Sequence, residues 1–301
     1  MDLLLNSIRG FCMALADSVP GVSGGTIAFI LGFYDKFINS LDDLIHGDLK
    51  KKKEAIFFLM KLAVGWIFGI ILAVLLLTKL FETHIYAVSS LFIGFILFSI
   101  PLIIKEEKDT LKGKYVNFIF TIIGIAIVAF ITYFNPMSGE ASSVDIANIN
   151  FGLAIYMFIA AMISISAMVL PGISGSTLML IFGLYVPLIS SIKEILNLNF
   201  ESLPALIIMA FGVIIGIVLV IRLIKIALEK YRSATIYFIL GLMLGSIYAI
   251  IMGPTTLEAV QSALSFKTFN IFFFLFGGII VLSLERLKLV LMQRQDNKRK
   301  D

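Results

Sequence analysis

The chain has 301 residues, of which 59% are hydrophobic and 15% are charged, and its formal net charge is +4. A soluble protein of this length needs far more polar surface to cover its core, so the composition excludes an ordinary soluble protein. Several apolar runs approach or exceed the roughly 20 residues that span a bilayer. We therefore predict an all-α protein that crosses a membrane several times.

The Cys, His, Lys and Arg residues exclude several kinds of site. A single cysteine, Cys12, excludes an internal disulfide, and the two histidines, His46 and His84, form no Cys/His cluster that would hold zinc or iron. The basic residues border the apolar runs, which is typical of membrane topology signals rather than of nucleic-acid binding. We expect no metal, no cofactor, no nucleic-acid partner and no removable signal peptide.

The first unusual stretch is residues 17–26, DSVPGVSGGT, which separates apolar segments at about residues 3–15 and 23–38. Proline removes a backbone donor and glycine adopts conformations that other residues avoid, so a continuous helix must break here. The first segment is too short to cross a bilayer comfortably and the second is marginal. We predict a re-entrant helical hairpin with its tip at residues 17–26.

Longer apolar spans follow at about residues 55–80, 85–104 and 116–134. The next stretch, residues 135–150, is polar and carries no Lys or Arg. We interpret it as a linker between an N-terminal repeat, residues 1–134, and a C-terminal repeat, residues 151–285.

The second half repeats this order of elements. Residues 151–170 lead into a second break, PGISGST at residues 171–177, and residues 174–190 lead out of it. Three more spans follow at about residues 203–228, 234–252 and 269–284. The chain ends in a basic tail at residues 286–301, which we expect to be cytoplasmic.

The two halves also match residue by residue. At an offset of 151 positions, the matching residues are Pro20, Gly21, Ser23, Gly24, Thr26, Gly32 and Tyr34 with Pro171, Gly172, Ser174, Gly175, Thr177, Gly183 and Tyr185. At an offset of 147 positions, they are Gly65, Gly69, Glu82, Gly94 and Ser99 with Gly212, Gly216, Glu229, Gly241 and Ser246. One match of Gly or Ser is weak evidence in a membrane segment, but the ordered set indicates a duplication.

The repeats are expected to be inverted. Each half contains a hairpin, which returns to its starting side, and three spans, so an odd number of crossings places the second half upside down. Twenty Lys and Arg residues fall on one predicted side of the membrane, and three fall on the other: Lys79, Lys193 and Lys267. Because basic residues favour the cytoplasmic side, both termini are predicted to be cytoplasmic. Re-entrant and fully spanning hairpins give the same count.

The two breaks are the candidate binding site. Non-helical backbone at membrane depth survives only where protein buries it or a polar cavity borders it, and in inverted repeats it usually marks a transporter's binding site. Free N–H groups where a helix restarts, together with Ser and Thr hydroxyls, suit an anion. The predicted anion-binding residues are Gly21, Val22, Ser23, Gly24, Gly25, Thr26, Gly172, Ile173, Ser174, Gly175, Ser176 and Thr177. The alternative is that these residues serve only as kinks and packing contacts.

Charged residues inside a membrane are costly and usually functional, so three of them are further candidates. Asp17 lies just before the first break, whereas its counterpart in the second half is Met168. Its carboxyl could exchange a proton or bind a cation that travels with the anion; the alternative is that it caps the following helix or pairs with a base. Arg222 and Lys61 are candidate counter-charges for an anionic substrate, or else they extend to the membrane surface.

One apparent catalytic motif does not fit its surroundings. Residues 21–25 match G-x-S-x-G, but that motif needs a strand-to-helix turn with a His and an acid as partners. Here the motif lies in a predicted membrane hairpin, and both histidines fall in polar connections. We therefore do not expect an enzyme.

The stretches DSVPGVSGGT at residues 17–26, GFYDK at residues 32–36 and PGISGST at residues 171–177 resemble the bacterial polyprenyl-phosphate transporter family, long described as domain of unknown function 368. Length and repeat layout extend the resemblance over essentially the whole chain. It implies that the substrate is undecaprenyl phosphate, the carrier lipid of cell-wall assembly. Family members are thought to return this lipid from the outer to the inner leaflet of the bacterial plasma membrane.

Together, the residues and the resemblance predict a multi-pass translocase of the bacterial plasma membrane that works by alternating access. The phosphate would bind at the two tips, Arg222 would supply positive charge, and Asp17 would couple movement to a proton or a cation. The alternative is a proton- or sodium-coupled secondary transporter of a small soluble anion. A third hypothesis is a membrane enzyme that acts on lipid phosphates. Membrane lipids surround the protein in each case, and a monomer and an oligomer are both compatible with this architecture.

Overall fold

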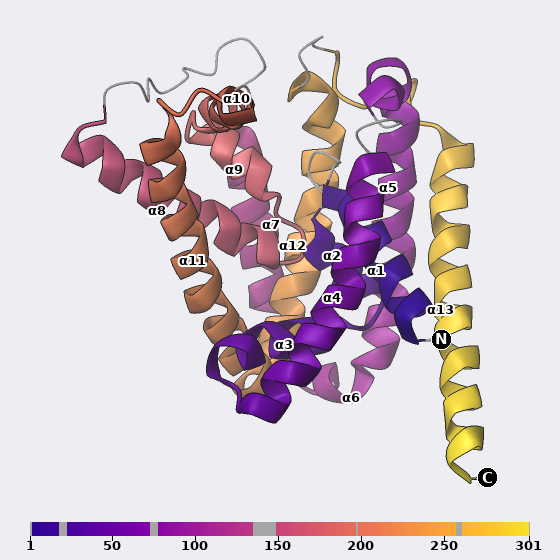
Figure 1. Cartoon of the computed structure of the whole chain (residues 1–301). Coiled ribbons are helices and arrows are strands. Elements are labelled where there is room, and N and C mark those ends of the chain that lie inside the picture. The colour runs from indigo at the N-terminus through magenta and orange to yellow at the C-terminus, as the bar shows by residue number, and fades with distance from the viewer. Residues whose placement is uncertain are drawn as a thin grey trace.

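The computed structural model describes residues 2–17, 23–72, 78–134, 149–196, 198–256 and 261–300. Every regular element in these residues is a helix (Figure 1). Six of these helices are long and apolar enough to cross a membrane: α4 (Leu49–Leu72), α5 (Thr78–Glu106), α7 (Phe118–Tyr133), α8 (Phe151–Val169), α11 (Leu203–Lys230) and α12 (Arg232–Met252). The prediction of an all-helical protein with several membrane spans is confirmed.

The outer surfaces of these helices are apolar. The exposed fraction of the residue is 66% at Phe68 of α4, 58% at Phe211 of α11 and 80% at Phe272 of α13 (Ile271–Lys300). Exposed Phe, Ile and Leu on so many helices would be unfavourable in water, whereas they fit the hydrocarbon core of a bilayer.

The six spans are not the six that the sequence suggested. Helix α8, predicted as the hairpin arm that leads into the second break, is itself long enough to cross, whereas the apolar part of α13 covers only Ile271–Ser283. Helix α13 then continues to Lys300, so the tail predicted from residue 286 is the end of this helix. Short elements that the sequence did not suggest are α6 (Lys108–Leu111), η2 (Tyr115–Asn117) and η3 (Gly253–Thr256).

The segments that lead out of the two breaks are divided, although each was predicted as a single arm. The first gives α2 (Gly24–Ile30) and α3 (Tyr34–His46), and the second gives α9 (Gly175–Ile181) and α10 (Tyr185–Leu196). The dividing turns contain Gly32 and Gly183, which both have φ +66, a left-handed conformation that glycine adopts without strain. In each turn the residue after glycine donates its N–H to the carbonyl five positions earlier, as in a Schellman motif.

Helices that are distant in sequence form four close pairs: α1 (Asp2–Asp17) with α4, α8 with α11, α5 with α13, and α7 with α12. In each pair, glycines lie where a Cβ atom would overlap a carbonyl of the partner helix. These contacts are Gly65 on Ser7 and Gly69 on Phe11; Gly212 on Phe158 and Gly216 on Met162; Gly94 on Phe274 and Gly277 on Leu91; and Gly241 on Thr121 and Gly124 on Phe238. The contacts of the first two pairs correspond through the sequence offsets of 151 and 147.

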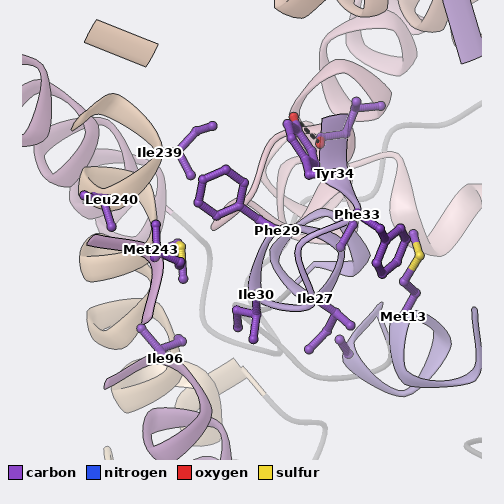
Figure 2. Close-up of a cluster of buried hydrophobic side chains, with 14 of the residues drawn as sticks. Met13, Ile27, Phe29, Ile30, Phe33, Tyr34, Ile96, Ile239, Leu240 and Met243 are labelled. Atoms are coloured by element: carbon purple, nitrogen blue, oxygen red, sulfur yellow. Dashed lines mark hydrogen bonds between the residues drawn. The ribbon is translucent and has the colours of Figure 1, made fainter. Parts of the chain in front are cut away.

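Helix α2 lies at the centre of the molecule, and all its residues are buried. Its side chains Phe29 and Ile30 enter a cluster with Ile96 of α5 and with Ile239 and Met243 of α12 (Figure 2). Helices α3 and α10 lie at opposite ends of the molecule, with α2 and α9 between them (Figure 1). The two breaks therefore meet near the middle.

The glycine contacts give a prediction about stability. Changing Gly65→Ala should lower the free energy of unfolding by about 1–3 kcal/mol, because the new methyl group forces α1 and α4 apart. Gly152→Ala is the matched control, since a Cβ there meets only the Asn150 side chain, at 3.4 Å. Thermal unfolding in detergent measures both variants; equal midpoints would contradict the role of the close approach.

Candidate substrate-binding site

Asp17, the last residue of α1, connects the two helices on either side of the first break. Residues 18–22, which include the predicted site residues Gly21 and Val22, lie outside the described part of the chain. One carboxylate oxygen of Asp17 accepts a hydrogen bond from the backbone N–H of Gly24 at 2.6 Å, and the other accepts from Nε1 of Trp66 at 3.2 Å. The carboxylate therefore binds the start of α2 and also fixes it to α4.

The hydroxyl groups of the first tip bind the second tip. Ser23, the N-cap of α2, donates to the carbonyl of Leu170 at 3.2 Å. The backbone N–H of Gly172 donates to Oγ1 of Thr26 at 2.8 Å, and the two hydroxyl oxygens of Ser23 and Thr26 lie 3.1 Å apart. The hydroxyl of Tyr34 donates to the carbonyl of Val169 at 3.2 Å. The structure thus brings the two predicted tips into direct contact.

The second tip is packed as tightly as the first. Gly172, Ile173, Ser174 and Gly175 are all buried. A Cβ atom on Gly172 would lie 2.5 Å from the carbonyl carbon of Leu242 in α12, so only glycine fits there. Thr177 is half-buried in α9. Ser176 belongs to the same helix.

A cavity of about 300 Å³, which we call the tip cavity, opens beside this contact. Asp17, Gly24 and Gly25 of the first tip line it, together with Trp66 and Met168. Its other walls are apolar side chains from α1, α3, α4, α8 and α11. Asp17 and its counterpart Met168 thus face the same cavity. The arrangement suits a largely apolar ligand with one polar end.

A second cavity, of about 320 Å³, lies on another side of α2, between α1, α5 and α13. Its lining consists of apolar side chains, among them Ile27, Phe95 and Phe273, together with Cys12. The second cavity is therefore suited to hydrocarbon and to no charged group.

The two predicted counter-charges lie elsewhere. Arg222 is exposed on α11 and does not line the tip cavity, although Ile217 of the same helix does. Lys61 is half-buried, and its carbonyl, not its ammonium group, accepts a hydrogen bond, from Ser7. The structure does not bring either charge to the tips.

Trp66 is the site residue that the sequence analysis missed. It is the one tryptophan of the chain, it lies between Gly65 and Gly69 on α4, and it binds Asp17. An indole N–H in the apolar part of α4 was the available signal, because an indole N–H in apolar surroundings usually needs an acceptor. Its partner could not be read from sequence, since it lies 49 positions away.

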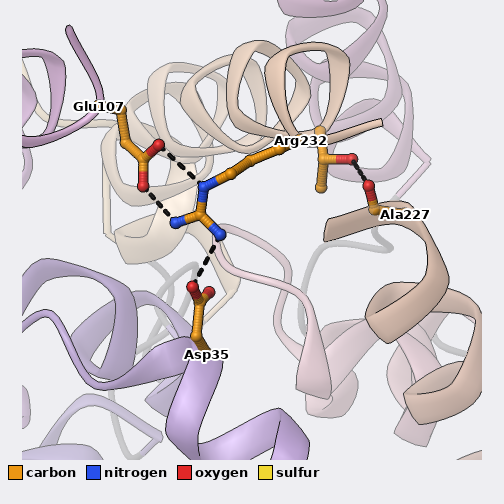
Figure 3. A network of polar contacts seen from close by, with 5 residues as sticks. Asp35, Glu107, Ala227 and Arg232 are labelled. Carbon is orange, nitrogen blue, oxygen red and sulfur yellow. Dashed lines mark hydrogen bonds and ion pairs between the residues drawn. The ribbon is translucent and has the colours of Figure 1, made fainter. Parts of the chain in front are cut away.

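Ion pairs hold α3 against the second half of the chain. Arg232 of α12 lies between Glu107, whose oxygens accept from Nε at 3.0 Å and Nη2 at 2.5 Å, and Asp35 of α3, which accepts from Nη1 at 2.8 Å (Figure 3). Asp42 of α3 accepts from Nζ of Lys225 in α11 at 2.6 Å. We call these five residues the α3 ion-pair cluster.

The charge on Asp42 is favoured by its partners. Burial acts to raise the pKa of this carboxyl, but the hydrogen bonds and charges of Lys225 and His46 outweigh it and lower the pKa. A carboxyl whose pKa is lower in the folded state stabilises that state above its unfolded pKa, and the effect disappears as the pH falls through the folded value. The pairing of α3 with α11 is therefore at full strength at neutral pH.

Comparison of the sequence with known proteins identifies its family. The sequence profile of the VCA0040-like family, described as undecaprenyl phosphate translocase-like, matches residues 13–268. A polyprenyl-phosphate transporter of Staphylococcus aureus is 32% identical over 283 residues, which cover 94% of this chain and 96% of that protein. A polyprenyl-phosphate transporter of Vibrio cholerae is 32% identical over 258 residues, 82% of this chain and 77% of that protein. No solved structure matches. The chain belongs to the undecaprenyl phosphate translocase-like family.

Proposed function

We propose that the protein is a translocase that moves undecaprenyl phosphate between the leaflets of the bacterial plasma membrane, so that this carrier lipid can be reused in cell-wall synthesis. One observation carries the proposal: two broken-helix tips meet through hydroxyl and N–H groups beside a cavity with mostly apolar walls. The names of the two relatives, polyprenyl-phosphate transporters, support the class of substrate.

The proposed architecture is a pair of inverted repeats, residues 1–134 and 151–285, each with a re-entrant hairpin. The glycine contacts support it, because exchanging the repeats turns the α1–α4 contacts into the α8–α11 contacts and the α5–α13 contacts into the α7–α12 contacts. The positions of α3 and α10 at opposite ends also support two hairpins that enter from opposite sides (Figure 1). With the basic residues on the cytoplasmic side, both termini are cytoplasmic.

In this mechanism the phosphate replaces the bonds between the tips. A phosphate oxygen can accept from the N–H of Gly172 and from the hydroxyls of Ser23 and Thr26, which now bind each other or the opposite backbone. Each donor keeps an acceptor in this exchange, so its main cost is that the carbonyl of Leu170 loses Ser23 as a donor. The prenyl chain follows the apolar walls of the two cavities beside α2.

The negative charge of Asp17 opposes a phosphate bound at the tips, so we propose that Asp17 is neutralised by a proton or a cation when the lipid binds. Arg222 and Lys61 keep their proposed role as counter-charges only along the route of the phosphate to the tips, since both lie away from the tip contact. The α3 ion-pair cluster closes the cytoplasmic end, and it must open for access from that leaflet.

The transport proposal is tested with purified protein in liposomes that contain labelled undecaprenyl phosphate in one leaflet. The double variant Ser23→Ala/Thr26→Val should lower the initial rate of translocation at least tenfold, because the phosphate loses two hydroxyl donors. Thr132→Val is the control, since its hydroxyl donates to the carbonyl of Val128 in its own helix and, among the described residues, to no other group.

A wild-type rate equal to that of empty liposomes, with the protein shown to be folded, would refute translocation. Uptake of a soluble anion that excess lipid does not inhibit would favour the secondary transporter instead. Release of inorganic phosphate by the pure protein would favour an enzyme.

The role of Asp17 gives a second prediction. Wild-type transport should accelerate as the pH is lowered, because protonation removes the charge that opposes the phosphate. Asp17→Asn should lose the part of this dependence that is due to Asp17, since an amide is neutral throughout, and keep only the part that is due to the second ionisation of the lipid phosphate, at about pH 6. Glu54→Gln, at an exposed position of α4, should keep the wild-type pH profile. A wild-type profile retained by Asp17→Asn would exclude Asp17 as the coupling group.

The closed cytoplasmic end gives a third prediction. In a Cys12→Ser background, a cysteine that replaces Leu41 of α3 would line the tip cavity and could be labelled by a water-soluble maleimide. Replacing Lys225→Gln and Arg232→Gln should increase the labelling rate about tenfold, because α3 loses its two ion pairs with α11 and α12, and α12 loses its ion pair with Glu107. Replacing Lys50→Gln and Lys53→Gln removes the same charge elsewhere and should leave the rate unchanged. Labelling that is equally slow in both pairs of variants would contradict gating by the cluster.

A further inference from the structure

A third cavity, of about 420 Å³, lies where α5 ends and α7 begins, around the short helix α6. We call it the α6 cavity. Apolar side chains, among them Ile104, Phe118 and Leu240, form most of its wall. Its polar lining consists of Lys108 and Lys112 of the α6 region together with Tyr115, Thr121 and Tyr237. It is separate from the tip cavity and shares no lining residue with it.

Both lysines are available to a ligand. Neither ammonium group has an ion pair with any residue that the structure describes. Two acids flank Lys108 in sequence: Glu107 is bound by Arg232 through two nitrogens (Figure 3), and Asp109 forms no ion pair with a described residue. The cavity therefore combines an apolar wall with two ammonium groups that form no ion pair with a described carboxylate.

The position of the α6 cavity in the molecule indicates how it would face a membrane. The apolar span His84–Glu106 ends at the cavity and the apolar span Tyr115–Tyr133 begins there, so the cavity lies at the level of the lipid head groups. Tyr115, which also lines the cavity, has an exposed fraction of 72%, and tyrosine is enriched at that level. Ile104 and Phe118 are exposed beside it, so hydrocarbon can reach the cavity from the bilayer.

We propose that the α6 cavity is a docking site for a lipid phosphate monoester in the cytoplasmic leaflet. This inference rests on the proposed function for two points: which side of the membrane the cavity faces, and that the transported lipid is a phosphate monoester. Lys108 and Lys112 bind the phosphate, and Ile104, Phe118 and Leu240 contact the start of the chain. A phosphate monoester carries close to two negative charges at neutral pH, whereas the phosphodiester of a common anionic phospholipid carries one. Two unpaired ammonium groups therefore match the monoester, and lysine binds phosphate well as a point charge.

The experiment places a photoreactive benzoylphenylalanine at position 118 and reconstitutes the protein in phosphatidylcholine nanodiscs with increasing undecaprenyl phosphate. Mass spectrometry then measures the crosslinked lipid. We expect saturable crosslinking, and Lys108→Gln/Lys112→Gln should raise the half-saturating lipid fraction tenfold or more. Lys108→Arg/Lys112→Arg should restore it, which separates lost charge from misfolding. Lys50→Gln/Lys51→Gln, two lysines outside the cavity, should match the unchanged protein.

Competition identifies the occupant. Undecaprenol, which lacks the phosphate, should not displace the crosslink, and phosphatidylglycerol should displace it only at about tenfold higher fraction. Equal displacement by phosphatidylglycerol would overturn the preference for a monoester. A crosslink that is insensitive to the lysine pair would overturn the site.

The tip variant Ser23→Ala/Thr26→Val separates this inference from translocation. It should slow transport at least tenfold and keep the crosslink at position 118, because the tip residues do not line the α6 cavity. Wild-type protein that crosslinks the lipid without moving it would refute translocation and leave the docking site standing. Transport whose half-saturating lipid fraction is the same with and without the lysine pair would refute the docking site alone.

Discussion

The hydrogen bonds between the two tips are the contact on which the rest of the structure depends. Each tip interrupts a helix in an apolar environment, where a backbone group without a partner is costly. Ser23 and Thr26 of the first tip satisfy the carbonyl of Leu170 and the N–H of Gly172 in the second, so neither break is stable in this form without the other. This mutual dependence places α2 at the centre of the core and explains why small residues are required on both sides.

The sequence predicted the helical class, the membrane spans in outline and the two breaks, because these depend on local composition. Apolar runs, Pro-Gly pairs and matching offsets are visible without any contact being known. It did not predict that the segment after each break is divided at Gly32 or Gly183, although a glycine two positions before a tyrosine occurs in both halves. It described residues 286–301 only as a basic tail, whereas α13 continues to Lys300, because the charged residues mark the end of the apolar part and not the end of the helix.

For the candidate site, the sequence predicted where the backbone breaks but not which side chains contact one another. The tips were expected to hold an anion, and in this conformation their hydroxyls hold one another. Trp66 and the α3 ion-pair cluster could not be found from sequence, since their partners lie far along the chain. Asp17 shows the limit most clearly: it accepts from Gly24 at the start of α2, which is the capping alternative, and the same carboxylate also faces a cavity, which a purely structural cap does not need.

The glycine contacts of the four helix pairs also affect how fast the protein can change conformation. In these contacts the backbone of one helix touches the backbone of the other, and no side chain can change rotamer to make room. The two helices of a pair therefore cannot slide along each other in small steps. Within α1–α4 and α8–α11 the helices must travel together, and displacement is left to the seams between pairs, where α2 and α9 lie. Exchange between conformations would then be a few rigid bodies switching across shared seams, with its rate set by the tips rather than by the long helices.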